Sequence, residues 1–127
     1  MLERLSSQNA PKAIGSYSPA SRVDNLIFTS GQLGLEPTTG KLAGDDITSQ
    51  ATQAMNNLKA ILEDNGSSLA KIVKTTVYLS DIADFASFDK VYQGFFAGQY
   101  PARTAFQVGA LPMAAKVEVE VVALIEE

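Results

Sequence analysis

The stretch from Lys116 to Ile125 constrains the fold most, because it predicts a strand in the interior of a sheet. Valines alternate with glutamates at its start, with the period of two that a strand gives its two faces, at Val117, Glu118, Val119, Glu120 and Val121. After that both faces are apolar, as is typical of a strand covered on both sides. Two carboxylates on one side of an interior strand, here Glu118 and Glu120, need a partner or water.

Short strands are predicted in the first third of the chain. Residues 1–6 could form an edge strand, and residues 20–23 and 26–29 form a hairpin because Asp24-Asn25 tolerates the left-handed conformation of a tight turn. Gly31 follows this hairpin, where it either lets the backbone approach another group closely or forms an ordinary bulge. Residues 33–44 are predicted to be a loop.

The first helix is predicted to begin at Asp46 or Thr48 and to end at Asn65-Gly66. Its apolar residues recur at the spacing of one helical face, at Ile47, Ala51, Ala54, Met55, Leu58, Ile61 and Leu62. The other face is predicted to meet water, with Gln50, Gln53, Asn57 and Glu63-Asp64.

A strand over residues 71–80 and a second helix follow. The strand alternates, so Val73, Thr75, Val77 and Leu79 are expected on one face and Ile72, Thr76 and Tyr78 on the other. The second helix begins near Asp81 or Asp84 and ends before Gly98 and Pro101. Its aromatic-rich stripe is predicted to be core, at Ile82, Phe85, Phe88, Val91, Tyr92, Phe95 and Phe96.

This order of elements predicts one α+β two-layer domain over residues 1–127, with a mixed sheet and both helices on one face. The other face of the sheet is left bare. Because few charges lie on the strands, that face is the expected surface for self-association.

Composition excludes several classes of function. The chain has no cysteine and no histidine, which excludes disulfides, thiolate nucleophiles, Ser-His-Asp triads and histidine-ligated metals. Its net charge of -4 and scattered basic residues disfavour nucleic-acid binding. The segment Met1–Arg4 lacks the apolar core of a signal peptide and no run is long enough to span a membrane, so we expect a cytoplasmic protein.

Arg103 stands out at the start of a predicted strand that runs to about Val108 and is otherwise small and apolar. Its guanidinium offers five donors in a planar fork, which suits bidentate pairing with a carboxylate. From the residues alone two alternatives stay open: a ligand-binding arginine, or a structural one that caps a helix end or pairs with a glutamate of the same chain.

Five motifs in register resemble the reactive-intermediate deaminase family, RidA subfamily. They span nearly the whole chain: Ala13-Ile14-Gly15-Ser16-Tyr17-Ser18, Phe28-Thr29-Ser30-Gly31-Gln32, Val73-Lys74-Thr75-Thr76-Val77-Tyr78-Leu79, Tyr100-Pro101-Ala102-Arg103-Thr104 and Val117-Glu118-Val119-Glu120. The resemblance implies a chorismate-mutase-like fold and a homotrimer with clefts between subunits. It also implies hydrolysis of 2-enamino and 2-imino acids, such as 2-aminoacrylate, to 2-keto acids and ammonia, with no cofactor and no metal.

The resemblance also implies roles for individual residues. Arg103 matches the arginine that grips the substrate carboxylate, and Glu118, expected on a neighbouring strand with a raised pKa, matches the glutamate that positions or activates water. The pocket would be lined by residues supplied in part by a neighbouring subunit, namely Tyr17, Ser30, Gly31 and the backbone of Ala105. From the residues alone, a salt bridge of Glu118 to Lys116, Lys74 or Arg103, a structural hydrogen bond for Glu120 and simple packing of Tyr17 stay open.

Two positions depart from the family pattern. Ala105 stands where many relatives carry a cysteine, which leaves only backbone contacts at that position. Asp89 stands where asparagine is common, and its carboxylate would repel an anionic substrate unless it points away or is paired. This departure keeps open an alternative function, a non-catalytic regulatory trimer that binds small carboxylates. A ribonuclease is the least favoured alternative, because the chain is acidic and lacks histidine.

Overall fold

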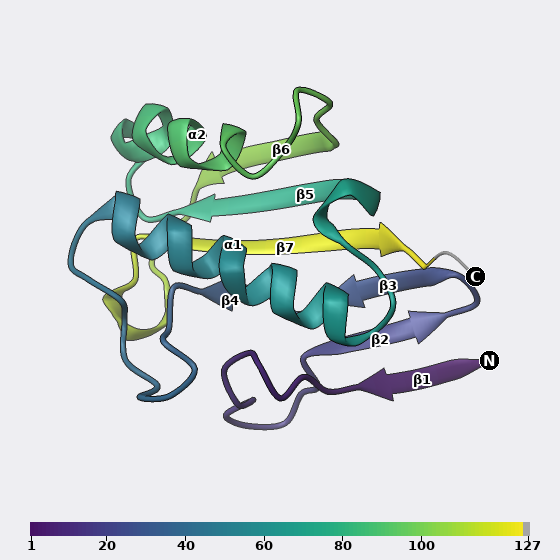
Figure 1. Ribbon diagram of the computed structural model, residues 1–127. Coiled ribbons are helices and arrows are strands. Elements are labelled where there is room, and N and C mark those ends of the chain that lie inside the picture. Colours follow the sequence, from purple (N-terminus) through teal and green to yellow (C-terminus); the bar gives the residue numbers. More distant parts are fainter. Residues whose placement is uncertain (126–127) are drawn as a thin grey trace.

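The computed structural model describes residues 1–125, which form a mixed sheet with two helices over one face (Figure 1). The strands are β1 (Leu2–Leu5), β2 (Ala20–Val23), β3 (Leu26–Thr29), β4 (Gln32–Leu33), β5 (Ile72–Leu79), β6 (Ala102–Gln107) and β7 (Val117–Leu124), and the α-helices are α1 (Ile47–Asp64) and α2 (Phe85–Gln93). The predicted α+β class with a mixed sheet is confirmed.

Strand β7 lies in the interior of the sheet, as its sequence predicts. The order of strands is β1-β2-β3-β7-β5-β6, with β4 also paired to β7. Among the strands of residues 1–125, only β5 and β6 pair in parallel, and β6 is an edge strand. Strands β3 and β4 follow one side of β7, since Phe28 pairs with Val122 and Gln32 pairs with Val119. The chain between them, at Ser30-Gly31, therefore passes beside the glutamates of β7.

The N-terminal elements follow the prediction closely. β1 is the edge strand opposite β6, and it pairs with β2 alone. β2 and β3 form the expected hairpin, in which Asp24 adopts a left-handed φ of 53°. The loop predicted over residues 33–44 begins one residue late, because Leu33 belongs to the short strand β4.

Helix α1 begins and ends where its sequence predicts, but its polar face is partly wrong. Asp46 caps it by accepting a hydrogen bond from the Ser49 amide, and Asn65 ends it. Gln50 and Asn57 are 2% and 1% exposed, although the helical period assigned both to water. Each side chain instead bonds the main chain of a distant loop or strand, so the helix packs with both apolar and amide groups.

The second half of the sheet departs from the prediction at two places. A bulge between Ile72 and Lys74 shifts the register of β5, so that Ile72 is buried and Val73 is 45% exposed. Helix α2 ends at Gln93, ahead of the predicted end, and a 3-10 turn over Ile82–Asp84 precedes it. Of the aromatic stripe, only Phe88 and Tyr92 are fully buried, and Ile82 is exposed.

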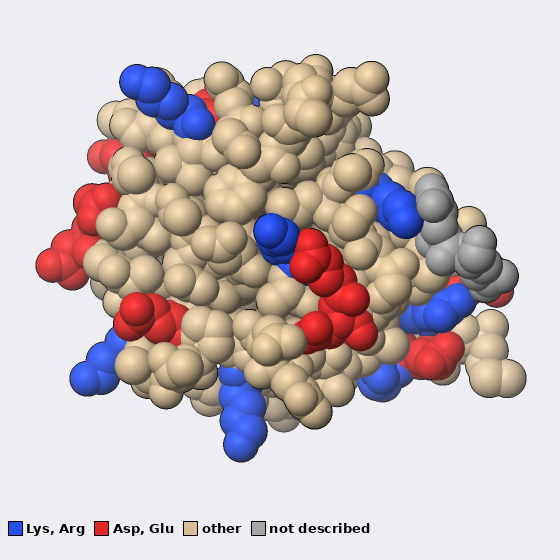
Figure 2. Space-filling model, in the orientation of Figure 1, with Lys and Arg blue, Asp and Glu red and all other residues tan. Residues whose placement is uncertain are grey.

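The two faces of the sheet differ. Both helices cover the face that carries Val117, Val119 and Val121, and helix and sheet together bury the core. The opposite face is bare in this chain, and it exposes Phe28 and Phe106 by more than 40% each. On the side shown in Figure 2, charged side chains are scattered and form no continuous basic area. No helix within residues 1–125 combines the length and apolar character needed to cross a bilayer.

Candidate functional site

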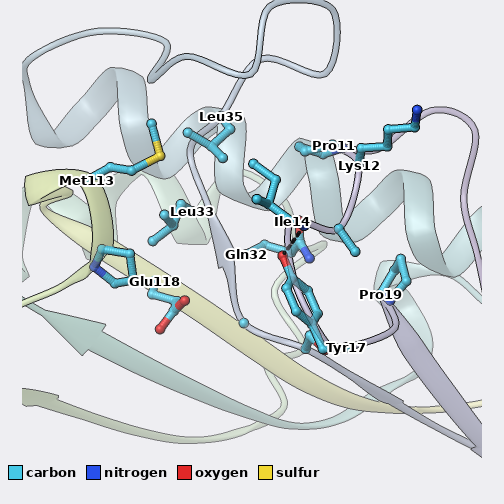
Figure 3. Close-up of a pocket in the computed structure, with 14 residues that line it drawn as sticks. Pro11, Lys12, Ile14, Tyr17, Pro19, Gln32, Leu33, Leu35, Met113 and Glu118 are labelled. Atoms are coloured by element: carbon cyan, nitrogen blue, oxygen red, sulfur yellow. Dashed lines mark hydrogen bonds between the residues drawn. The ribbon is translucent and has the colours of Figure 1, made fainter.

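A pocket of about 530 Å³ lies beside Glu118, and we call it the Glu118 pocket (Figure 3). Its walls come from residues 11–19, from β4 and from the loop that precedes β7. Apolar side chains such as Ile14, Leu33, Leu35 and Met113 supply most of the lining. The polar groups that join them are Lys12, Tyr17, Ser30, Gln32 and Glu118. Three of the residues expected to line a site with Glu118 therefore do meet it: Tyr17, Ser30 and Gly31.

Glu118 is placed by the alternation of β7. Its neighbours Val117 and Val119 point into the core, so the Glu118 side chain lies on the bare face. Gly31 packs directly against it: a Cβ added to Gly31 would lie 2.7 Å from the Glu118 Cδ. Of the two alternatives for this glycine, the structure shows the close approach. The backbone at Gly31 therefore lies directly against the Glu118 carboxylate.

The two glutamates of β7 have different environments. Glu120 accepts a hydrogen bond of 2.6 Å from the Tyr78 hydroxyl, an interaction that raises the pKa of Tyr78 to about 12. Glu118 has no hydrogen-bond or ion-pair partner among residues 1–125, so none of the three salt bridges considered for it forms. Burial raises the pKa of the Glu118 carboxyl, and the nearby Glu120 raises it further. Glu118 is therefore the carboxylate left available for proton transfer.

Tyr17 and Ser30 offer limited hydrogen-bonding capacity to a ligand. The Tyr17 ring is half exposed, and its hydroxyl accepts a bond of 3.3 Å from the Ile14 amide, drawn as a dashed line in Figure 3. The Ser30 hydroxyl donates its hydrogen to the Ser18 carbonyl at 2.6 Å. Ser30 can therefore only accept from a ligand or a water, whereas Tyr17 can still donate.

Arg103 lies on the other side of the sheet. It pairs in register with Thr75, which is buried in the core, so both side chains point to the helix-covered face. The guanidinium carbon lies 5.1 Å from the ring centre of Phe85 and 4.8 Å from that of Tyr92. The aromatic stripe of α2 thus belongs to the core and also packs against the Arg103 guanidinium. The sequence pattern did not reveal this second role.

Arg103 is paired within its own chain. Its Nη1 lies 2.7 Å from Asp89 Oδ1, and this bond is the main cause that lowers the pKa of Asp89. The partner is Asp89, whereas the structural alternative named a glutamate. The Nε and Nη2 donors have no hydrogen-bond partner among the described residues. A second pocket, of about 470 Å³, opens beside this pair between α2 and the turn at Tyr100-Pro101, and we call it the Arg103 pocket.

Arg103 and Glu118 therefore do not share a pocket within one chain. Strand β5 separates their strands, so the expectation that Glu118 lies on a strand next to Arg103 is wrong. Ala105 lies on the same face as Arg103, packed against the core. One chain holds two half-sites: Glu118, Gly31, Ser30 and Tyr17 on the bare side, and Arg103 with Ala105 under α2. Within residues 1–125 no three carboxylates gather closely enough to hold a metal ion.

Comparison with known proteins decides the family. The model of a family described as Endoribonuclease L-PSP matches residues 7–125. The 2-iminobutanoate/2-iminopropanoate deaminase of Rattus norvegicus is 43% identical over 94% of this chain and 88% of its own length. The chain belongs to the RidA family.

Other members of the family are as similar. The RutC family protein y4sK of Sinorhizobium fredii is 48% identical over 96% of this chain and 97% of that protein. The crystal structure of RidA from the Antarctic bacterium Psychrobacter superposes with a TM-score of 0.93 at 41% identity, covering 97% of this chain and 99% of the other. The fold of this RidA-family chain is therefore shared along nearly its whole length.

Proposed function

We propose that this protein hydrolyses 2-imino acids and their 2-enamino tautomers to 2-keto acids and ammonia, at clefts between the subunits of a homotrimer. Relatives such as the rat protein are named 2-iminobutanoate/2-iminopropanoate deaminase, which supports the reaction class. The observation that carries the proposal is Glu118: a half-buried carboxylate with a raised pKa, no bonding partner among the described residues, and a pocket in front of it.

Assembly completes the site in this proposal. The half-sites lie on opposite faces of one sheet, so they form one cleft only when the Arg103 pocket of one subunit meets the Glu118 pocket of another. The bare sheet face, with Phe28, Phe106 and Leu124 exposed, supplies apolar area for such contacts.

The chemistry requires placement and one proton carrier. The substrate carboxylate binds the Nε and Nη2 donors of Arg103, which directs the C=N carbon towards Glu118. Water adds to the carbon of the protonated imine while the Glu118 carboxylate accepts a proton from it. The protonated Glu118 then gives this proton to the amine nitrogen. The C–N bond breaks and its electron pair leaves with ammonia. The Glu118 carboxylate takes the hydroxyl proton as the carbonyl forms and passes it to the ammonia, so the products are a 2-keto acid and ammonium, and Glu118 is again ionised.

A test compares Glu118→Gln with Glu120→Gln, a matched variant two residues away on the same face. Imino acid is generated in the assay and its hydrolysis is followed. Glu118→Gln is expected to lower kcat/KM by about 10²–10⁴-fold, because the general base is lost. Glu120→Gln is expected to keep most activity, since an amide oxygen still accepts the Tyr78 hydrogen bond.

The pH profile sharpens this test. A general base must be ionised, so activity is expected to rise with pH through the pKa of Glu118, above the usual range of a glutamate. Removing the charge of Glu120 takes away the second cause of the raised pKa, so Glu120→Gln moves this acid limb to lower pH. Wild-type rates in Glu118→Gln would reject the proposal. Keto-acid binding without any acceleration of hydrolysis would assign the protein to the non-catalytic alternative.

A further inference from the structure

The Arg103 pocket holds two opposite charges side by side. The rings of Phe85 and Tyr92 pack against the guanidinium, and its N–H donors lie in its plane, so a ligand that bonds it lies along its edges. Asp89 occupies one position on those edges, through the bond of 2.7 Å to Nη1. The side chains of Arg103 and Asp89 are 23% and 28% exposed, and both line the pocket. A ligand that reaches Arg103 therefore lies next to Asp89 as well.

Asp89 keeps its charge and part of its bonding capacity. Oδ1 accepts from Arg103, and Oδ2 accepts a bond of 3.0 Å from the Gln93 amide. An ionised carboxylate has about four acceptor positions, so two bonds leave room for a further donor. Because the bond to Arg103 lowers its pKa, the carboxyl is ionised at neutral pH.

We propose that the Arg103 pocket selects ligands in which a carboxylate is joined to a carbon that bears a protonated nitrogen, and that Asp89 determines this selectivity. The carboxylate binds the free Nε and Nη2 donors of Arg103, while the N–H groups of the neighbouring cationic nitrogen bond Asp89. This inference rests on the proposed function, for which it names the form of the substrate: the protonated imine, a zwitterion.

The same arrangement discriminates against the product. Hydrolysis replaces the cationic nitrogen with a carbonyl oxygen, so the 2-keto acid is a plain anion with an acceptor where the donor had been. That oxygen faces the Asp89 carboxylate, which repels it and leaves its own acceptor position unused. Asp89 therefore favours release of the keto acid and limits product inhibition.

Calorimetry with alanine and pyruvate tests the selectivity directly, because the two molecules share a carbon skeleton and differ in the cationic nitrogen. Wild-type protein is expected to bind alanine about tenfold tighter than pyruvate, the effect of one screened charge interaction. In Asp89→Asn the two affinities are expected to become about equal, chiefly because pyruvate binds more tightly than it does to the wild type. Asp84→Asn is the matched control, at the residue immediately before the same helix. Asp84 makes no capping bond and does not line the pocket, so this variant keeps the wild-type ratio.

Three results would overturn the inference: pyruvate bound to the wild type as tightly as alanine, a preference for alanine in Asp89→Asn as large as in the wild type, or no binding of either molecule. Loss of both ligands in Arg103→Ala places the binding at this pocket. Imine hydrolysis measured in parallel separates the two proposals. Selective binding without hydrolysis would reject the proposed function alone, and hydrolysis without selectivity would reject the role of Asp89 alone.

Discussion

The contact between Gly31 and Glu118 positions the proposed base. The Glu118 side chain leaves no room for a Cβ at position 31. A Cβ built there would lie 2.7 Å from the Cδ and 2.9 Å from the Oε2 of Glu118. Gly31 has no left-handed φ, so its backbone would accept alanine. The glycine is therefore required by the space that Glu118 occupies.

Gly31→Ala should displace the Glu118 carboxylate while the fold persists. We expect kcat/KM to fall by about 10–100-fold, since a displacement of about 1 Å in a catalytic group has effects of this order. Gly109→Ala is the matched control, because a Cβ at position 109 meets no atom within 4 Å. Equal activity in the two variants, with unchanged circular dichroism, would show that Glu118 does not need its observed position.

The backbone around Gly31 is held by an element far away in sequence, helix α1. Asn57 donates two hydrogen bonds, of 3.2 Å to the Leu33 carbonyl and 2.9 Å to the Leu35 carbonyl. Gln50 links the Gly44 carbonyl to the Lys116 amide, next to the start of β7. These buried amides join the helix to β4, where Leu33 pairs with Glu118, and to the residue just before β7, the strand that carries Glu118.

Asn57→Ala should destabilise the protein by about 2–3 kcal/mol, because it leaves one buried and one partly buried carbonyl group without their donor. Denaturant unfolding measures this, and Asn56→Ala, at the exposed neighbouring position, should change stability by less than about 0.5 kcal/mol. The loss at position 57 should also weaken activity, since β4 and Gly31 lose their anchor. A stability equal to that of Asn56→Ala would contradict the role of this amide.

The buried amides also show where prediction from the sequence stops. The spacing of Ile47 to Leu62 predicts the helix and its apolar face correctly, because periodicity is local. It cannot show that Asn57 faces inward, because the carbonyls that it bonds lie 22 and 24 residues away. The predicted face of Val73 is wrong for a similar reason. Alternation assumes regular pairing along the whole strand, and the bulge in β5 is a feature of its pairing with β7.

The candidate site shows the same division between local and distant information. The family resemblance predicts that Glu118 and Gly31 line one pocket and that the pKa of Glu118 is raised, whereas the direct contact of Gly31 with Glu118 is seen only in the structure. The stretch around Arg103 predicts that the guanidinium pairs with a carboxylate. It does not predict which one, since Asp89 belongs to another element, helix α2. That the two half-sites lie on opposite faces follows only from the strand order.

At the scale of the whole molecule, the proposed reaction requires two copies of the chain to share one cleft. Arg103 points to the helix-covered side and Glu118 to the bare side, so no rearrangement of side chains within one sheet brings them together. A homotrimer in which each cleft takes Arg103 from one subunit and Glu118 from the next satisfies both positions by symmetry.

Mixed trimers of Arg103→Ala and Glu118→Gln subunits test this claim most directly. The two variants, each with its own affinity tag, are co-expressed, and trimers that carry both tags are purified. Each variant alone is expected to be inactive, whereas every mixed trimer contains one cleft with both residues intact. We predict that such trimers regain about a third of wild-type activity. Mixed trimers as inactive as their parents would contradict a site shared between subunits.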